Sequence, residues 1–289
     1  MNVEIICPLY NAENYIKELD KSFKIQKNVD IKKISYILTK SKDNTELILK
    51  ELDAQYSIIE PEDFSHSLSR EQVAMKSKAD ILVFVTQDVE IKNDDWLENL
   101  IRPIIENEVE ATFSRQLTKY NNLEKYTREK NYPEKSYITS EKDLKIKGLR
   151  TFFFSDASSA IKKEIFKELN GYDGKKLPTN EDMYIAYKII TNGYKIKYCS
   201  DSIVYHSHKF TLNQLYKRYY DTGLFFSQNK YLDKYGTSKT GSGLAIYILK
   251  NAIKDKNVKV LLEFIPNMFV RMLGMKIGKK DGMKFERGC

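Results

Sequence analysis

Short apolar runs alternate with segments of helical spacing along the first half of this chain. Four runs rich in β-branched and aromatic residues predict strands that are covered on both faces: residues 3–9, 34–39, 56–59 and 81–85. Three segments between them place apolar side chains three and four positions apart, as a helix does: residues 14–25, 45–52 and 68–78. This alternation predicts an α/β fold with a mostly parallel sheet and flanking helices on both faces.

The pattern continues less regularly to about residue 210. Helices are predicted over residues 93–108 and 181–192, and strands over residues 111–114 and 195–198. Residues 121–147 are polar and irregular, and we expect a loop with short helices there. Beyond this point the chain changes character. We therefore predict an α/β domain over residues 1–210 and a helical extension over residues 211–289.

The predicted extension is dense in aromatic and basic residues. Residues 212–229 read as one helix, and residues 235–242, which carry Gly, Ser and Thr, predict a hinge. Residues 258–277 then place apolar side chains at near-helical spacing beside several Lys and Arg: Leu261, Ile265, Met268 and Met272. Two interpretations stay open. The segment is either a helix packed on the α/β domain or an in-plane amphipathic helix on an anionic membrane surface.

Composition narrows the class of protein. The chain has 289 residues, 30% of them charged and 42% hydrophobic, which is typical of a soluble globular protein. Its three cysteines, Cys7, Cys199 and Cys289, show no zinc-knuckle spacing, and their odd number argues against a disulfide framework. Because the first residues resemble no secretion signal and no segment is apolar enough to span a bilayer, we expect a cytoplasmic protein.

The net charge of +8 indicates either an anionic partner or simply a lysine-rich surface. Phosphates, nucleic acid and acidic lipid are the partner classes that this charge favours. The aromatic residues gather near the C-terminal end and do not interleave with arginines, and no nucleic-acid motif is present. We therefore expect no nucleic-acid partner.

A carboxylate follows the most apolar of the predicted strands. Residues 81–85 lead directly into Thr86, Gln87 and Asp88, and the carboxyl ends of such strands border the ligand crevice of α/β sheets. Asp88 can hold a divalent cation against a phosphorylated ligand, or it can cap the next turn. His206 and His208 share one face of a later strand and can join Asp88 in a metal or phosphate site.

Three further clusters carry candidate chemistry, and each has a plain structural alternative. The loop from Pro8 to Asn11 can hold a nucleotide, although Asn11 can equally cap a helix. Arg70 offers a fork for phosphate, and His66 donates either to a phosphate or to backbone. Glu181 and Asp182 open a helix, where carboxylates either complement the helix dipole or supply a general base.

The order of these motifs resembles the inverting family 2 glycosyltransferases with a GT-A fold, and within them the bacterial rhamnosyltransferases. The resemblance covers roughly residues 1–225 and rests on nine segments: Pro8–Asn11, Ser41–Thr45, Phe64–His66, Arg70, Thr86–Asp88, Ser155–Ala160, Gly171–Asp173, Asn180–Asp182 and His206–His208. It implies that residues 1–210 form a nucleotide-sugar-binding catalytic domain.

The resemblance also implies roles for individual residues. Asp182 matches the catalytic base, with its neighbour Glu181 as the next candidate. Asp88 and His206 match the ligands of a divalent cation, Mg²⁺ or Mn²⁺, although Thr86 replaces the first aspartate of the family motif. The residues that match donor contacts are Pro8, Tyr10, Asn11, Thr39, Asp43, His66, Arg70, Gln87, Asp88 and His208.

The second strand lacks the aspartate that contacts the base in many relatives, because Leu38 and Thr39 stand there. A thymidine donor is compatible with this difference. We therefore expect an inverting rhamnosyltransferase that moves rhamnose from dTDP-rhamnose to a hydroxyl of a lipid-linked surface polysaccharide, at the inner face of the cell membrane. Two alternatives stay open: a family 2 transferase that uses a UDP-hexose, and a non-catalytic binder of anionic lipid or nucleic acid.

Overall fold

The computed structural model describes residues 1–236 and 238–285. Its first half alternates strands and helices as predicted: β1 (Asn2–Leu9), α1 (Ile16–Lys24), β2 (Asp30–Thr39), α2 (Thr45–Glu51), β3 (Tyr56–Ile59), α3 (His66–Lys76) and β4 (Ile81–Val85). These four strands pair in parallel in the order β3, β2, β1, β4. Side chains of β4 alternate between two apolar clusters, one on each face of the sheet, so the strand is covered on both sides as expected.

Beyond β4, the sheet contains antiparallel as well as parallel strand pairs. The next elements along the chain are β5 (Val89–Glu90), α4 (Trp96–Ile105), β6 (Ala111–Leu117), α5 (Leu123–Asn131), β7 (Tyr137–Thr139), α6 (Leu144–Lys147), β8 (Ser158–Lys162), α7 (Lys163–Glu168), α8 (Glu181–Thr191) and β9 (Ile196–His206). Strand β8 lies antiparallel between β4 and β6, and β9 runs parallel to β6. Two reversals therefore return β9 to the direction of β4, and both strands end at the same edge.

The sequence pattern did not indicate β8. Residues 148–152 before it form a 3₁₀ helix, and the strand itself begins with two serines. Every residue of β8 is nevertheless buried. Ser158 accepts a hydrogen bond from the indole nitrogen of Trp96 (3.1 Å) and lies 2.6 Å from the hydroxyl of Ser114, so its polar group is satisfied inside the core.

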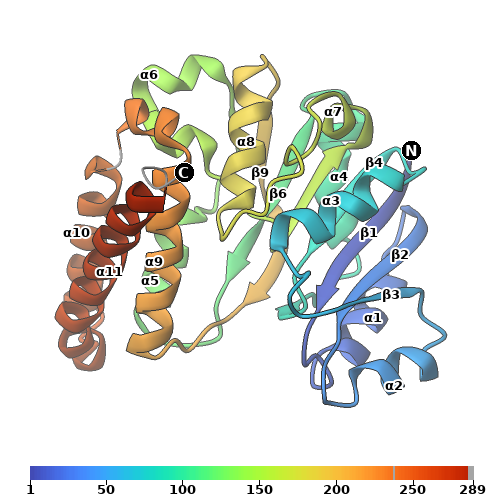
Figure 1. The fold of residues 1–289 in the computed structure, drawn as a ribbon, viewed down its shortest axis with the longest axis horizontal. Helices are drawn as coiled ribbons and strands as arrows, with labels where there is room; N and C mark the ends of the chain where they lie inside the picture. Colours follow the sequence, from blue (N-terminus) through green and yellow to red (C-terminus); the bar gives the residue numbers. More distant parts are fainter. Residues whose placement is uncertain (237, 286–289) are drawn as a thin grey trace.

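Three long helices stand together beside the sheet (Figure 1): α9 (Leu212–Gln228), α10 (Ser238–Lys254) and α11 (Val258–Phe285). Helices α9 and α11 approach each other through glycines. A Cβ atom at Gly223 would lie 2.4 Å from the backbone of Met275, and one at Gly278 would lie 2.0 Å from the backbone of Tyr220. The contact therefore excludes side chains at these positions and fixes one helix against the other.

Helix α10 begins at Ser238, inside the segment predicted as a hinge. Residue 237, which belongs to that predicted hinge, lies outside the described residues. Buried side chains of α10 and α11 join α5 in a third apolar cluster that contains Tyr126, Ile248 and Phe264. The extension is thus packed on the α/β part through α5.

The exposed face of α11 differs from the apolar face that helical spacing predicted. Leu261 and Met268 pack against the third cluster. The solvent face carries Val258, Leu262, Ile265, Phe269 and Met272, which are 56–75% exposed. In the described part of the chain, no helix combines the length and apolar character that crossing a bilayer requires.

Candidate functional site

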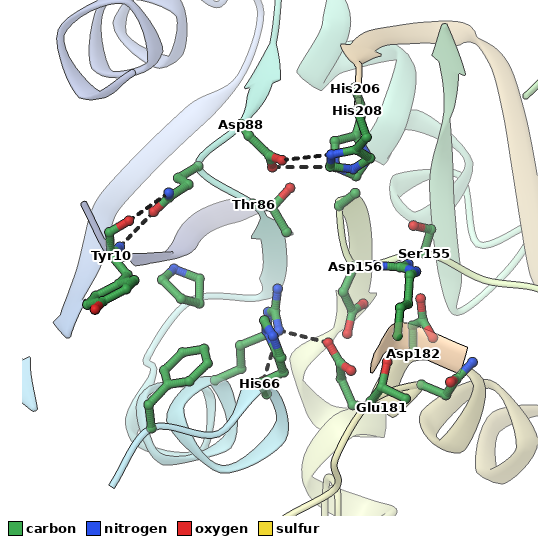
Figure 2. Close-up of a pocket in the computed structure, with 18 of the residues that line it drawn as sticks. Tyr10, His66, Thr86, Asp88, Ser155, Asp156, Glu181, Asp182, His206 and His208 are labelled. Carbon is green, nitrogen blue, oxygen red and sulfur yellow. Dashed lines mark hydrogen bonds and ion pairs between the residues drawn. The ribbon is translucent and has the colours of Figure 1, made fainter. Parts of the chain in front are cut away.

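A cavity of about 640 Å³ opens where β1, β4 and β9 end. Parallel strands end at a common edge, so the residues after each of these strands meet there. The turn before β8 and the first turn of α8 close the cavity from below, and α9 closes its remaining side. Figure 2 shows Asp88 with two histidines along one wall, and Glu181 and Asp182 across from them.

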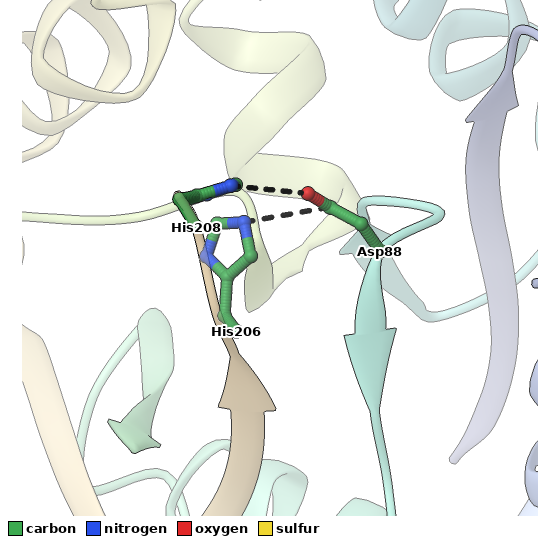
Figure 3. A group of neighbouring side chains, drawn as sticks. All are labelled: Asp88, His206 and His208. Carbon is green, nitrogen blue, oxygen red and sulfur yellow. Dashed lines mark ion pairs between the residues drawn. The ribbon is translucent and has the colours of Figure 1, made fainter. Parts of the chain in front are cut away.

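Asp88, His206 and His208 converge at the upper wall (Figure 3). The Nε2 atom of His206 lies 3.4 Å from Oδ1 of Asp88, and the Nδ1 atom of His208 lies 3.6 Å from Oδ2. One ligand atom from each residue lies within 4.8 Å of the others. Three donors at this separation can surround one cation at ordinary nitrogen and oxygen bond lengths of about 2.0–2.3 Å.

The orientation of His206 is fixed from behind. Its Nδ1 atom lies 3.0 Å from the side-chain oxygen of Gln116 and 3.4 Å from a guanidinium nitrogen of Arg128, so the ring is held by these two side chains. Gln116 is itself held, because its amide nitrogen donates to Ser155 (2.8 Å) and Arg128 donates to its oxygen. These contacts leave the Nε2 atom directed at the site beside Asp88, which is the arrangement of a metal-ligating histidine.

The protonation states also suit a cation. Burial alone would raise the pKa of Asp88, but its hydrogen bond and charge interaction with His206 and the nearby His208 hold that pKa below its usual range. Burial lowers the pKa of His206, and burial with the neighbouring His206 lowers the pKa of His208 to about 4. Near neutral pH the site therefore offers one carboxylate and two neutral imidazoles, the forms that bind metal. The residues present fit a divalent cation.

Glu181 and Asp182 are adjacent at the start of α8, yet their surroundings differ. Glu181 is 8% exposed and accepts a 3.0 Å hydrogen bond from Arg70, which is 1% exposed. Burial raises the pKa of Glu181, but His66 and Arg70 outweigh this effect and hold it below its usual value. Glu181 is therefore an ionised carboxylate that is already bound to a partner.

Among the described residues, no cation lies within salt-bridge distance of Asp182. It is partly buried, lines the cavity, and accepts a hydrogen bond from the backbone N–H of Met183 (2.7 Å). Burial raises the pKa of Asp182 well above its usual range, and the charges of Glu181 and Asp156 raise it further. A carboxylate with a raised pKa and free access to a cavity has the properties of a general base. Of the two predicted catalytic residues, Asp182 has the geometry of the base and Glu181 does not.

The Arg70–Glu181 pair supports the floor of the cavity, so breaking it should destabilise the fold. We expect Arg70→Met to lower the free energy of unfolding by about 3–5 kcal/mol, because Glu181 would remain buried without its cation. Chemical denaturation measures this change. In the double variant Arg70→Met, Glu181→Leu, most of the loss should be recovered. A single variant within about 1 kcal/mol of the parent would show that the pair is not structural.

Several predicted donor contacts lie in the cavity wall. Gln87 holds the loop after β1 by accepting from the backbone N–H of Tyr10 (2.7 Å) and donating to its carbonyl (2.9 Å). Pro8 and His66 line the same wall, as do Asp88 and His208. Arg70 also lines it, but its guanidinium is bound to Glu181 and to the carbonyl of His66 (2.9 Å).

Three predicted donor contacts lie outside the cavity lining. Asn11 is exposed with a left-handed backbone (φ 49°). Asp43 accepts from the backbone N–H of Thr45 and Glu13 and so joins the start of α2 to the loop after β1. Thr39 is buried, and its hydroxyl has no hydrogen-bond partner within the described part of the chain. Their contact with a donor stays a prediction.

Sequence reasoning missed the contribution of α9. Arg218, Tyr219 and Thr222 line the cavity and face Asp182 and the histidines. The available signal was their spacing, which places them on one side of the predicted helix over residues 212–229. Asp156 was also given no role. It is a buried residue of the cavity lining and accepts hydrogen bonds from Tyr172 (2.8 Å) and Ser159 (2.8 Å).

At this edge of the sheet, a candidate cation site lies opposite the carboxylate of Asp182. This arrangement suits an enzyme that acts on a nucleotide sugar. The model of the family "Glycosyl transferase family 2" matches residues 4–170, which is more than half of the chain. The chain therefore belongs to the family 2 glycosyltransferases, and it is a glycosyltransferase with the GT-A fold predicted from its motifs.

Two curated relatives match over nearly the whole length. The O-antigen chain rhamnosyltransferase RfbN of Salmonella typhimurium is 30% identical over 284 residues, which cover 96% of this chain and 90% of the relative. The O-antigen chain rhamnosyltransferase WbaN of Salmonella anatum is 31% identical over 280 residues, which cover 95% and 88%. The predicted resemblance to rhamnosyltransferases is confirmed.

Solved structures share the fold at low sequence identity. The mannosyltransferase PcManGT from Pyrobaculum calidifontis, in complex with GDP-Man and Mn²⁺, aligns with a TM-score of 0.62 at 13% identity and covers 99% of this chain and 87% of its own. Residues 1–349 of S. aureus TarS, in complex with UDP-GlcNAc, align with a TM-score of 0.60 at 14% identity and cover 100% and 92%. These likenesses support the fold alone.

Proposed function

We propose that this enzyme transfers rhamnose from dTDP-rhamnose to a hydroxyl of a glycan acceptor, with inversion at the anomeric carbon. Both curated relatives carry the name O-antigen chain rhamnosyltransferase. The observation that carries the proposal is the position of Asp182. This carboxylate has no salt-bridge partner among the described residues, and it lies in the cavity that also holds Asp88, His206 and His208. Base and leaving-group site thus face each other across the space where a sugar would lie.

The reaction would be a single displacement. Asp182 accepts the proton of the acceptor hydroxyl as the oxygen attacks the anomeric carbon. The bond from that carbon to the diphosphate breaks on the opposite side, through an oxocarbenium-like transition state. Glu181 stays ionised and bound to Arg70. Its negative charge raises the pKa of Asp182, which makes Asp182 a stronger base.

The opposite wall receives the leaving group. Asp88, His206 and His208 would hold a divalent cation, Mg²⁺ or Mn²⁺. When bound, such a cation neutralises charge that develops on the departing diphosphate. Arg218 faces the same space and adds positive charge from α9. Gln116 contacts Nδ1 of His206 and holds the ring in the orientation that this role requires.

The donor is tested by a panel of nucleotide sugars. Purified enzyme is incubated with an acceptor glycan and either dTDP-rhamnose, UDP-glucose, UDP-GlcNAc or GDP-mannose, each with and without Mn²⁺, and products are identified by mass spectrometry. We expect a deoxyhexose to be added from dTDP-rhamnose with Mn²⁺. Transfer from a UDP-hexose alone would overturn the donor assignment and select the alternative donor class.

We also propose that the acceptor is lipid-linked and that α11 docks the enzyme on an anionic membrane surface. The outer face of α11 presents Leu262, Ile265 and Phe269 to solvent over about two turns. Lys276 and Lys280 are also exposed and continue that face, since they follow Met272 by four and eight residues. An apolar face that continues into lysines has the chemistry of an in-plane membrane helix.

Liposome binding tests this face. We expect salt-sensitive binding to anionic vesicles. The double variant Leu262→Gln, Phe269→Gln should weaken this binding at least about tenfold, because the two apolar side chains that would be buried in lipid are replaced by polar ones. Ile146→Gln is the matched control, since Ile146 is 87% exposed on α6. The membrane role is wrong if the wild-type enzyme does not bind anionic vesicles at low salt. It is also wrong if the control variant weakens binding as much as the double variant does.

A further inference from the structure

A second cavity of about 280 Å³ adjoins the first on the far side of Asp182. Asp182, His206 and His208 line both cavities, as do Arg218 and Tyr219. The loop after β1 and Gln87, which border the first cavity, do not line the second. The second cavity is therefore reached from the base and lies away from the proposed donor loop, in the position of an acceptor.

Its walls are aromatic and cationic. Tyr132, Phe153 and Phe154 supply ring faces, and three arginines come from three different helices: Arg128 from α5, Arg218 from α9 and Arg271 from α11. Apolar walls with a few placed polar groups are typical of a small-molecule site. The volume lies just below the usual range of such pockets, which suits a single sugar residue better than a longer glycan.

The arginines differ in how their charge is balanced. Arg128 lies 3.1 Å from the carboxylate of Glu124 and donates to Gln116. Arg271 has no carboxylate within salt-bridge distance among residues 1–236 and 238–285. It donates to the hydroxyl of Tyr219 (2.8 Å), and its guanidinium lies over that ring at 5.1 Å from the centroid. Its Nε atom is buried and has no hydrogen-bond partner among the residues that the structure describes.

Packing alone does not account for this arginine. Helices α9 and α11 are already joined by the close contacts of Gly223 and Gly278, which need no charge. Taking a guanidinium partly out of water without a counter-ion is costly, and an apolar side chain would cover Tyr219 as well. Arg271 points to the cavity side of α11, away from the exposed face that carries Leu262 and Phe269.

We infer that the second cavity binds the acceptor sugar, and that Arg271, oriented by Tyr219, binds an anionic group on or next to that sugar. The ligand chemistry is a phosphate or a carboxylate, from a diphosphate-linked lipid or from an acidic sugar respectively. This inference rests on the proposed glycosyl transfer, because it assigns the acceptor of that reaction. Arg218 borders both cavities and so cannot by itself separate donor from acceptor binding.

Acceptor kinetics distinguish the two sources of the anion. The same sugar is offered as a prenyl diphosphate, as a disaccharide with a uronic acid, and as a neutral alkyl glycoside. We expect Arg271→Gln to raise KM about 10- to 100-fold for one anionic acceptor, as loss of a charged hydrogen bond does, and to leave KM for the neutral glycoside and for the donor within twofold. The acceptor that responds identifies the source. Equal effects on anionic and neutral acceptors, or no effect, would overturn the inference.

Two variants separate binding from a purely structural role. Tyr219→Phe removes the hydroxyl that Arg271 uses but keeps the ring, so it should raise the anionic-acceptor KM less than Arg271→Gln does. Lys217→Gln, a neighbouring exposed cation on α9 that lines neither cavity, should leave KM unchanged. If Tyr219→Phe and Arg271→Gln lower the unfolding temperature and raise KM for all acceptors in parallel, Arg271 is a helix-packing residue and the inference fails.

A binding measurement keeps this inference apart from the donor assignment. Calorimetry with inorganic pyrophosphate, without divalent cation, should show binding to wild type that Arg271→Gln weakens at least tenfold. Lys217→Gln, which removes a cation outside both cavities, should bind the same probe as wild type does. This result stands even if the donor panel selects another sugar. Equal pyrophosphate affinity in wild type and Arg271→Gln would reject the site.

Discussion

Asp182→Asn should lower turnover by about 10²- to 10⁴-fold while leaving donor affinity nearly unchanged. The amide keeps the shape of the side chain but cannot take a proton from the acceptor hydroxyl. Donor affinity should survive because the cation site and the loop after β1 lie on other walls of the cavity. Steady-state kinetics with dTDP-rhamnose, together with calorimetry of donor binding, measures both quantities.

The pH profile supplies the control for this variant. The pKa of Asp182 is raised, and a general base works only when deprotonated, so wild-type kcat/KM should fall as the pH drops through that raised pKa. In Asp182→Asn, the residual rate should not show this fall at low pH. Asp221→Asn, on the neighbouring helix α9 and outside both cavities, should keep the wild-type profile. Wild-type turnover in Asp182→Asn would remove Asp182 from the mechanism and make Glu181 the next candidate.

Asp88→Ala should abolish the metal-dependent part of nucleotide diphosphate binding. Asp88 supplies the only carboxylate of the three-residue cluster found in the described part of the chain. Without it, two neutral imidazoles remain, which are weak ligands for Mg²⁺ or Mn²⁺. Calorimetry with dTDP, with and without Mn²⁺, should show a metal effect in wild type that is lost in the variant.

Matched variants show whether this loss is specific to the cluster. Asp94→Ala removes an aspartate that pairs with Lys27 at 2.5 Å on the surface, and it should leave the Mn²⁺ effect intact. Gln116→Leu removes a side chain that holds the ring of His206 in its orientation and should weaken the metal effect about 10- to 100-fold. If Mn²⁺ does not change dTDP affinity in wild type, the assigned cation site is wrong.

Local patterns were sufficient for the first half of the fold. The hydrophobic pattern within each segment was enough to predict strands β1 to β4 and the helices between them. The structure confirms these predictions. Strand β8 could not be found in this way, because Ser158 and Ser159 look exposed in sequence. They are buried only because Trp96, Ser114 and Asp156 supply hydrogen bonds from other elements.

The site was predictable to a similar degree. Asp88 follows a strand with a strongly apolar sequence. Because side chains alternate along a strand, His206 and His208 lie on one face, so only the direction of β9 was needed to predict that they approach Asp88. Arg218 and Arg271 reach the site through the close packing of α9 on α11. That packing depends on glycines whose partners lie about 50 residues away in sequence, which no local pattern reveals.

Helix α11 shows a different limit. Apolar side chains occur around most of its circumference, so spacing alone predicted a helix but could not select the exposed face. Leu261 and Met268 face the cluster with α5 and α10, and Leu262 and Phe269 face solvent. The choice is made by the position of Gly274 and Gly278 against α9, which sets the rotation of the helix.

The anomeric configuration of the product tests the account most directly. Nuclear magnetic resonance of the glycan made from dTDP-rhamnose with Mn²⁺ should show a rhamnosyl linkage opposite in configuration to the donor, and no product should accumulate with Asp182→Asn on the same time scale. A linkage that retains the donor configuration would contradict a single displacement driven by Asp182.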